Sequence, residues 1–190
     1  ENCRVLLGDV RTIDVVNRSV SFNDSHIGYD TLVVAAGARH SYFGHPEWEQ
    51  HAPGLKTIED ATEIRRRLLV AFELAERAAD SERRRALLTF VIVGGGPTGV
   101  EMGGAMAEIA RFSIRHEFRR IDPSESQVLL IEATDRILPT YPPNLSAKAK
   151  QSLERLGVVV RTKTMVSDVG ANHVMLEGGG SNQQLSTYNV

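Results

Sequence analysis

The sequence is poor in the residues from which several kinds of functional site are built. Its 190 residues include one cysteine, Cys3, which excludes an internal disulfide and any metal site that needs several thiolates. Lysine and arginine number 22 against 24 aspartates and glutamates, so no basic field is expected to attract nucleic acid. No apolar run approaches the ~18 residues of a membrane span, and no signal peptide is visible.

Glycine, in contrast, is concentrated in one place. The chain has 16 glycines, and six of them lie between Gly94 and Gly104. Apolar residues make up 42 % and charged residues 24 %, a composition that indicates a folded protein with a sizeable core. At roughly 150 residues per domain, the length allows one domain or a little more.

The first forty residues are predicted to form β-structure. Turn residues such as Asn17-Arg18 separate segments that are rich in β-forming side chains. The expected strands are Arg4–Leu7, Val10–Val16, Ser19–Phe22 and Thr31–Ala36. Residues 38–56 contain two prolines and two glycines and are expected to form a connection.

A helix is expected to follow this connection. Thr57 is a suitable N-cap, and Asp60 places a negative charge in the first turn. Apolar residues then recur at helical spacing at Ile64, Leu68, Phe72, Ala75 and Ala79. Arginine runs at 65–67 and 83–85 flank this stripe, and they fit either a solvated helix face or a site for phosphate or a partner.

From about residue 87 the sequence alternates between strand and helix, which predicts an α/β fold with a parallel sheet. Two buried strands are expected, Leu87–Val93 and Gln127–Ile131, followed by a third strand, Val158–Thr162. The expected helices are Pro97–Phe118 and Leu145–Leu156, the second preceded by Asn144 and ended by a left-handed Gly157. Short strands return at Met165–Val169, at His173–Glu177 and in the last few residues.

The two β-rich ends of the chain resemble each other. A shift of 154 positions places Asp14 on Asp168 and Val20 on Val174, and the rhythm of strands and turns matches. A tandem duplication of a nucleotide-binding domain explains this order, although coincidental β ends remain an alternative. On the first interpretation the chain is a fragment, with the late part of one copy at 1–42, a linker and helix at 43–86, and an incomplete second copy at 87–190.

Residues 91–99 read Val-Ile-Val-Gly-Gly-Gly-Pro-Thr-Gly, a glycine loop between a buried strand and a helix. In a Rossmann-like domain Gly94 permits the tight turn, Gly96 lets the backbone approach a pyrophosphate, and Gly99 allows close helix packing. The pyrophosphate then lies at the helix N-terminus, where Pro97 needs no N–H donor. Gly103 and Gly104 are expected to extend the close packing. The candidate cofactor-binding residues of the loop are Gly94, Gly95, Gly96, Pro97, Thr98 and Gly99.

Acidic residues near this loop are candidates for reading the dinucleotide. Glu132 ends the second buried strand, where a carboxylate accepts hydrogen bonds from the adenosine ribose and repels a 2′-phosphate, so NAD(H) is favoured over NADP(H). Ala133 and Arg136 follow it, and Arg136 could stack on adenine or hold a phosphate. Glu101 fits two interpretations, a carboxylate that the helix dipole favours or a group beneath the nicotinamide.

Several motifs occur in an order that resembles type II NADH dehydrogenases, the NADH:quinone oxidoreductases of the two-dinucleotide-binding-domain flavoprotein superfamily. The strings that carry the resemblance are Tyr29-Asp30-Thr31-Leu32-Val33-Val34-Ala35-Ala36-Gly37-Ala38, Gly54-Leu55-Lys56-Thr57-Ile58-Glu59-Asp60-Ala61, Gly94-Gly95-Gly96-Pro97-Thr98-Gly99-Val100-Glu101 and Ile131-Glu132-Ala133. The resemblance extends over essentially the whole chain.

The resemblance implies that NADH gives a hydride to FAD, which reduces a membrane quinone. Residues 1–42 would then belong to an FAD-binding domain, with Ala36 and Gly37 at the flavin, and 87–190 to the NAD(H)-binding domain. Glu101 would lie near the nicotinamide as the catalytic candidate. The usual threonine of the flavin motif is replaced by Ala35 or Ala36. The parent would be a cytoplasmic protein, peripheral on the inner face of the bacterial plasma membrane through a segment absent here, and homodimer formation is left open.

Other functions remain as alternatives. They are a disulfide, peroxide or ferredoxin reductase of the same superfamily, or a nucleotide-binding module without catalysis; the isolated fragment is expected to be inactive. Cys3 is interpreted as a small core residue. His40, His45 and His51 are interpreted as parts of an ordinary loop rather than a metal site, and His116 as a surface residue.

Overall fold

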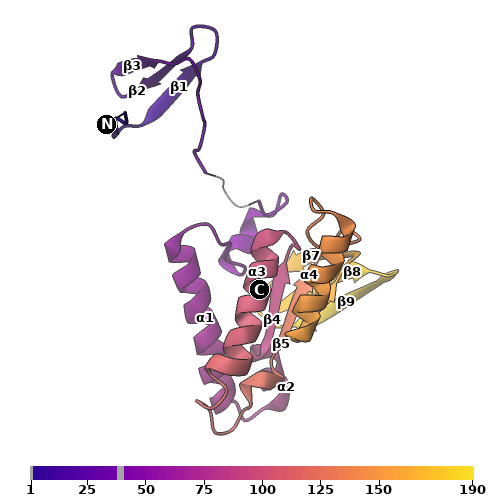
Figure 1. Cartoon of the computed structure of the whole chain (residues 1–190). Helices are drawn as coiled ribbons and strands as arrows, with labels where there is room; N and C mark the ends of the chain where they lie inside the picture. Colours follow the sequence, from indigo (N-terminus) through magenta and orange to yellow (C-terminus); the bar gives the residue numbers. More distant parts are fainter. Residues whose placement is uncertain (1, 38–40) are drawn as a thin grey trace. The chain divides into compact units, whose positions relative to one another are not determined.

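The computed structural model describes residues 2–37 and 41–190. Its backbone contacts divide the chain into two compact units, Glu1–Ala38 and Arg39–Val190. The linker and the helix that follows it therefore belong to the same unit as the glycine loop. Figure 1 labels the elements of both units, which are described separately below.

The first unit is a three-stranded antiparallel meander. It consists of β1 (Val10–Asp14), β2 (Ser19–Phe22) and β3 (Ser25–Gly28), in that order across the sheet. Two predicted strands are absent from the described residues, Arg4–Leu7 and Thr31–Ala36, because neither segment has a partner strand to bond with. The interpretation of Cys3 as a core residue is also wrong, since its side chain is exposed.

The second unit is built on a parallel sheet in the order β4-β5-β6. Its strands are β4 (Thr89–Val93), β5 (Gln127–Ile131) and β6 (Val158–Arg161). β4 and β5 pair over all five residues, with Val91 opposite Leu129. The apolar runs predicted all three strands, and β5 has its predicted bounds because both of its faces are covered. β4 starts at Thr89 rather than Leu87, because Leu87 ends a helix, and β6 ends at Arg161 rather than Thr162.

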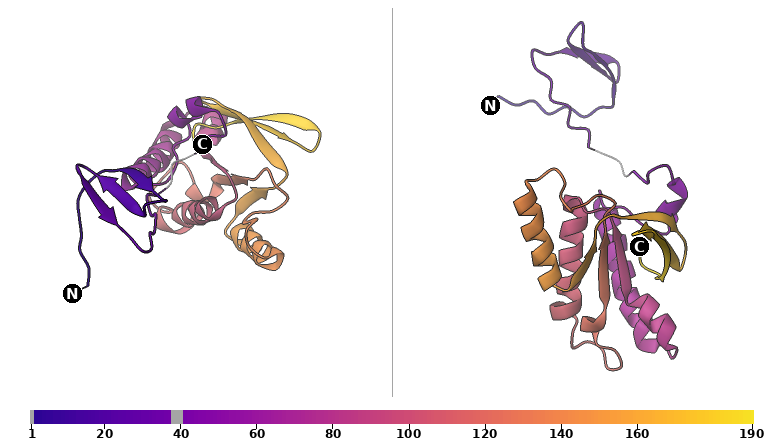
Figure 2. Two further views of the ribbon diagram at one scale, coloured as in Figure 1. Left: turned by 90° about the horizontal axis from the view of Figure 1, so that it is seen from above. Right: turned by 90° about the vertical axis from the view of Figure 1, so that its right-hand side faces the viewer.

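Two hydrophobic clusters cover the two faces of this sheet. On one face Phe90, Leu130 and Val158 pack with side chains from the helices. On the other face Val91 and Leu129 pack with Trp48 and with a second meander. Figure 2 shows these layers, with α3 (Pro97–Glu108) and α4 (Pro143–Arg155) on one side of the sheet and the second meander (residues 164–186) on the other.

The helix predicted after Thr57 is α1 (Ile58–Arg77), and it starts as expected. The Thr57 hydroxyl accepts the Asp60 N–H, while the Asp60 carboxylate accepts the Thr57 N–H, which completes a capping box. The predicted stripe is buried at Leu68, Phe72 and Ala75. At its end Ala78, rather than the predicted Ala79, is the buried alanine, because the helix ends at Arg77 and the stripe shifts by one residue.

The arginine run at 65–67 is partly engaged within the fold. Arg66 and Arg67 donate to the Glu63 carboxylate at 2.7 and 2.8 Å, which lowers the pKa of Glu63 to about 2. Arg67 also donates to the His51 carbonyl at 2.9 Å and so joins α1 to the linker, which contains the short 3-10 helix η1 (Pro46–Gln50). These contacts favour the structural interpretation of this run over a phosphate site.

The C-terminal end of α1 is attached to the chain that precedes β5. The Glu76 carboxylate accepts the backbone N–H groups of Arg119, Arg120 and Ile121. Burial raises the pKa of this carboxyl, but the three donors outweigh it and hold the pKa below its ordinary value. The short helix α2 (Ser81–Leu87) then leads into β4, with the Asp80 carboxylate accepting the Arg83 N–H as its cap.

The helix after the glycine loop is shorter than the predicted span Pro97–Phe118. Here α3 (Pro97–Glu108) passes into the π-helix η2 (Ile109–Ser113), and the helical backbone ends there. The wider π-turn rotates the side chains that follow it to another face of the helix. The spacing of apolar residues in the sequence does not predict this change. A 3-10 turn, η3 (Pro123–Glu125), precedes β5. As predicted, His116 is exposed.

The next helix, α4 (Pro143–Arg155), starts before the predicted Leu145. Asn144 therefore lies inside the helix and is not its cap; Pro142 takes that place. Pro143 is the first helical residue, a position where proline is favoured because no N–H is needed. Gly157 has a φ of +85°, which confirms the left-handed position predicted at the end of this helix.

The chain ends in a second meander of β7 (Thr164–Val169), β8 (His173–Gly178) and β9 (Ser181–Ser186). It repeats the form of the first meander, and each has an irregularity in its first strand pair. The turn pairs are Asp14–Ser19 and Val169–Val174, which are 155 residues apart (169 − 14 and 174 − 19). The hairpins therefore align with a shift of 155, so the predicted shift of 154 is wrong by one residue.

Residues after the second meander return to the sheet beside β4. The Val91 N–H donates to the Asn189 carbonyl at 2.8 Å, and Asn189 forms a parallel bridge with Phe90. The Thr187 hydroxyl donates to the Thr89 carbonyl at 2.5 Å, and the Asn189 amide donates to the Leu87 carbonyl at 2.8 Å. The end of the meander is thereby fixed to the start of β4.

We expect Phe72→Ala to lower the free energy of unfolding by about 3–5 kcal/mol, because the phenyl ring is fully buried between Phe90 and Phe118. Urea unfolding followed by the emission of Trp48, the single tryptophan, measures the change. Phe112→Ala is the matched control, because that ring is 72 % exposed and its loss should cost less than about 0.5 kcal/mol. Equal effects of the two substitutions would contradict the described core.

Candidate nucleotide-binding site

The glycine loop forms a tight turn between β4 and α3. Gly94 has a φ of +104°, a left-handed conformation that favours glycine, and its N–H donates to the Ile131 carbonyl at 2.8 Å. A Cβ on Gly99 would lie 2.0 Å from the carbonyl oxygen of Gly94. The helix can follow the strand this closely only because both positions are glycine, as the sequence predicted for each of them.

The N-terminus of α3 is open toward the site. Gly96 is its N-cap and provides no side-chain acceptor, and Pro97 occupies the first turn. A Cβ on Gly96 would meet no described atom within 4 Å, so the backbone has space for a close ligand. The first N–H groups of a helix have no partner inside it and carry its positive dipole end, which suits an anionic group.

Two glycines farther along α3 have a different environment. Cβ atoms on Gly103 and Gly104 would lie no closer than 3.6 and 3.9 Å to their neighbours, which is ordinary van der Waals contact. The prediction that these residues extend the close packing is therefore wrong, because a Cβ atom fits at either position without a clash.

Glu132 follows β5 directly and contacts the glycine loop. One carboxylate oxygen, Oε2, accepts the Gly95 N–H, and the other, Oε1, accepts the Thr134 N–H, both at 2.7 Å. Burial raises the pKa of the carboxyl, but the backbone donors at Thr134 and Gly95 outweigh this effect and hold the pKa below its ordinary value. Glu132 is therefore a fixed anion at neutral pH.

The residues after Glu132 form a compact exposed loop. Ala133 is exposed, and the Arg136 guanidinium donates to the Pro139 carbonyl of the same loop at 3.0 Å. Its Nη1 also lies 3.8 Å from the Asp135 carboxylate. Arg136 is thus near Glu132, as predicted, but its guanidinium contacts its own loop.

Glu101 follows Pro97 and Thr98 by one helical turn. It lies on α3 with its side chain exposed, and it is not among the residues that line the adjacent cavity. Its assignment as the catalytic group therefore stays a prediction. Ala36 and Gly37 lie in the first unit, where Gly37 has a φ of +75° and space around its Cα.

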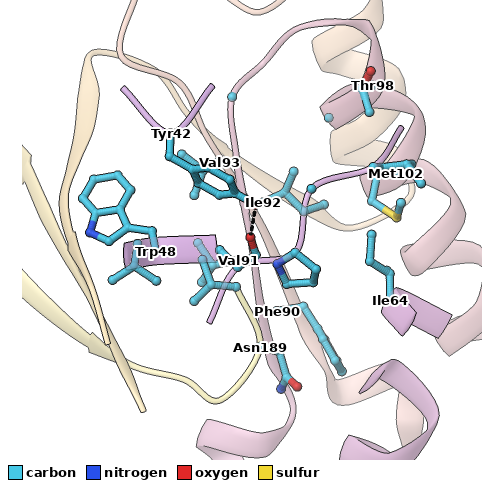
Figure 3. Close-up of a pocket in the computed structure, with 18 of the residues that line it drawn as sticks. Tyr42, Trp48, Ile64, Phe90, Val91, Ile92, Val93, Thr98, Met102 and Asn189 are labelled. Carbon is cyan, nitrogen blue, oxygen red and sulfur yellow. Dashed lines mark hydrogen bonds between the residues drawn. The ribbon is translucent and has the colours of Figure 1, made fainter. Parts of the chain in front are cut away.

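An apolar cavity of about 430 Å³ lies beside the glycine loop (Figure 3). One wall is β4 with Gly94 and Gly96, and another is α3 with Met102 and Met106. The linker and α1 complete it with further side chains, among them Tyr42, Trp48, Ile64 and Leu68. The glycine loop therefore borders an apolar space of the kind that holds small ligands.

Two aromatic residues of the linker were not predicted as site residues. The Tyr42 hydroxyl donates to the Ala52 carbonyl at 2.9 Å, and burial, followed by the charge of Glu49, raises its pKa above the ordinary value. Trp48 is buried and stacks on His45 with ring centroids 4.3 Å apart. Their separation from the glycine loop by more than forty residues leaves no local signal for this contact.

The histidine interpretation is only partly covered by the structure. His45 and His51 flank η1 in the linker, whereas His40 lies outside the described residues. Among residues 2–37 and 41–190, no group of three or more His, Cys, Asp or Glu side chains is placed to hold a metal ion. Within the same ranges no helix is long and apolar enough to span a membrane.

Residues 1–188 match the family described as pyridine nucleotide-disulphide oxidoreductase. Relatives include the type II NADH:quinone oxidoreductases Ndh and NdhA of Mycobacterium tuberculosis, 44 % identical over 180 residues and 46 % identical over 173 residues. The matches cover 93 % and 89 % of this chain, but 39 % and 37 % of the relatives. The chain thus spans less than half the length of these proteins.

A solved structure of NDH2 from Plasmodium falciparum in complex with NADH is also similar. Its TM-score is 0.76 at 26 % identity, over 92 % of this chain and 37 % of that chain. These similarities confirm the predicted α/β fold and the resemblance to type II NADH dehydrogenases.

We expect Gly99→Ala to lower the free energy of unfolding by about 1–3 kcal/mol, the usual cost of overpacking, because the new methyl would clash with the Gly94 carbonyl. Gly104→Ala is the matched control in the same helix. It should be neutral or stabilise the chain by up to about 1 kcal/mol, because it adds helix propensity without a clash. Urea unfolding of both variants measures the difference, and a harmless Gly99→Ala would contradict the described turn.

Proposed function

Because the chain belongs to the pyridine nucleotide-disulphide oxidoreductase family, we propose that it is the NADH-binding part of an FAD-dependent NADH dehydrogenase that reduces a quinone. The observation that carries this proposal is the link between an acidic strand end and the phosphate turn. The Glu132 carboxylate accepts the N–H of Gly95 at 2.7 Å, next to an uncapped helix N-terminus. This arrangement suits a dinucleotide with free ribose hydroxyls.

In the proposed complex, the N–H groups at the start of α3 bind the pyrophosphate of NADH. Gly94, Gly95, Gly96, Pro97, Thr98 and Gly99 form this part of the site. Gly96 permits the pyrophosphate to approach the backbone, since a Cβ atom built on Gly96 would have no neighbouring atom within 4 Å. The positive end of the helix dipole and the donated hydrogen bonds then offset the two negative charges of the ligand.

Glu132 then selects the dinucleotide. A carboxylate has about four acceptor sites, and two of them are already used by Gly95 and Thr134. The remaining two match the 2′- and 3′-hydroxyls of the adenosine ribose. A 2′-phosphate would meet a fixed anion instead, which disfavours NADPH. Ala133 and Arg136 border this position and complete the adenosine end of the proposed site.

The cavity beside the loop offers a place for the nicotinamide half of the ligand. Its walls are apolar, and they exclude water from a group that must transfer a hydride. Glu101 is proposed to lie near this end of the cofactor, on the helix that binds the pyrophosphate. In the first unit, the left-handed Gly37 and its neighbour Ala36 are proposed to contact the flavin.

The overall reaction would convert NADH, a proton and a quinone into NAD⁺ and a quinol. FAD, when bound, supplies the acceptor for the hydride and returns two electrons to the quinone. Quinone as the partner is supported by the names of the relatives from Mycobacterium tuberculosis. Peripheral association with the inner face of a bacterial plasma membrane and a homodimer are further parts of the proposal.

We expect the chain to bind NADH at least tenfold more tightly than NADPH, and Glu132→Ala to narrow this ratio. Hydrogen bonds to a charged group contribute about 1.5–3 kcal/mol, and 1.4 kcal/mol corresponds to about tenfold in affinity. Calorimetric titration measures both dissociation constants. Energy transfer from Trp48 to the reduced nicotinamide provides a second signal, because this tryptophan lines the cavity.

Glu154→Ala is the control for this comparison, since it removes an exposed carboxylate from α4 without touching the loop. The affinities of Glu154→Ala for NADH and NADPH should equal those of the unchanged chain. The proposal would be contradicted if the chain did not bind NADH, or if it bound NADPH more tightly than NADH. In the longer protein that contains this chain, NADH-dependent reduction of a ferredoxin or disulfide instead of a quinone would favour a different reductase.

A further inference from the structure

We propose that Glu132 also acts as a positioning residue that holds the phosphate-binding loop in shape before any ligand arrives. Ribose recognition and pyrophosphate binding would then be coupled through Gly95. The ligand side of this inference rests on the proposed function. The positioning of the loop, however, is a property of the ligand-free chain and is tested without NADH.

One short segment, residues 132–138, holds the Gly95 backbone from both sides. Its N–H donates to Glu132 Oε2 at 2.7 Å, and its carbonyl accepts the Leu138 N–H at 2.7 Å. Gly95 is buried, so water does not readily replace either partner. The segment 132–138 therefore decides where the middle of the glycine loop lies.

The segment 132–138 is itself fixed by neighbouring strands and by α4. The Glu132 N–H donates to the Arg161 carbonyl, and the Glu132 carbonyl accepts the Thr164 N–H. Farther along, the buried Ser146 hydroxyl donates to the Ile137 carbonyl at 2.5 Å. Leu138 has a φ of +50°, a conformation that a leucine adopts only when its surroundings impose it. The carboxylate is thus presented from a rigid support.

The space around Gly95 is too small for a side chain. A Cβ there would lie 2.8 Å from the Ile137 side chain and 3.0 Å from Glu132 Oε2. Gly95 does not have a positive φ, so its requirement for glycine comes from this close contact. The middle glycine of the loop is therefore matched to Glu132, whereas Gly94 serves the turn.

The chemistry of the carboxylate makes this role testable. Glu132 accepts two N–H donors, one on each oxygen. In Glu132→Gln one oxygen becomes an NH₂ group, which cannot accept, so one backbone donor loses its partner. A residue that only recognises ribose would leave the ligand-free loop unchanged by this substitution. A positioning residue would not.

The test measures amide hydrogen exchange of the ligand-free chain by NMR for the unchanged protein and Glu132→Gln. We expect the Gly95 or the Thr134 amide, whichever loses its acceptor, to exchange at least tenfold faster. Glu154→Gln, on the surface of α4, should change neither. Unchanged exchange at both amides in Glu132→Gln would overturn the proposal whatever the chain binds.

A ligand comparison provides the second readout. ADP and adenosine share the adenine and the ribose, and only ADP carries phosphates. We expect Glu132→Gln to weaken the binding of ADP at least threefold more than the binding of adenosine. Equal losses of affinity would indicate ribose recognition alone and would contradict the coupling. If Glu132→Gln does not fold, Gly95→Ala replaces it, and the same excess loss for ADP is expected because the methyl displaces the carboxylate. If the unchanged chain binds neither ADP nor NADH, the proposed function fails, and the exchange experiment still decides the positioning role.

Discussion

The close approach of Gly99 to the Gly94 carbonyl is the constraint on which the second unit depends. A side chain at Gly99 would come within 2.0 Å of that oxygen, so the first turn of α3 can meet the end of β4 only without one. This contact sets the direction of α3 and the position of its open N-terminus. It also brings Gly95 against the residues that follow β5. The glycine loop, the acidic strand end and the helix are therefore one geometric unit rather than three separate motifs.

Sequence patterns predicted most reliably the elements that a single local rule determines. β5 was found at its full bounds, Gln127–Ile131, because a strand that is buried on both faces is continuously apolar. The start of α1 was found because Thr57 and Asp60 bond to each other across one turn. Elements that depend on remote partners were missed or overestimated. Thr31–Ala36 has strand residues but no described partner strand, and the π-helix at Ile109 breaks a helix whose sequence carries no stop signal.

In the site, too, the sequence predicted features that depend on neighbouring residues and missed contacts between residues far apart in the chain. The roles of Gly94 and Gly99 follow from their spacing, and the structure agrees with both. The bond between Gly95 and Glu132 joins residues 37 positions apart, and no spacing rule announces it. Trp48 and Tyr42 reach the cavity through the linker, whose proline and glycine content suggested only a connection. The helical position of Glu101 was predicted correctly, but its side chain is exposed and does not line the cavity.

The return of the chain to β4 has a consequence for the order of events during synthesis. The Thr187 hydroxyl bonds to Thr89 across 98 residues, and the Asn189 amide bonds to Leu87 across 102. Contacts this distant in sequence close large loops, which costs chain entropy and slows folding. A ribosome that has released β4 must add about a hundred residues before these partners exist, at roughly 5–20 residues per second. During those seconds one edge of β4 is open, and a chaperone or a neighbouring nascent chain has its best opportunity to bind there.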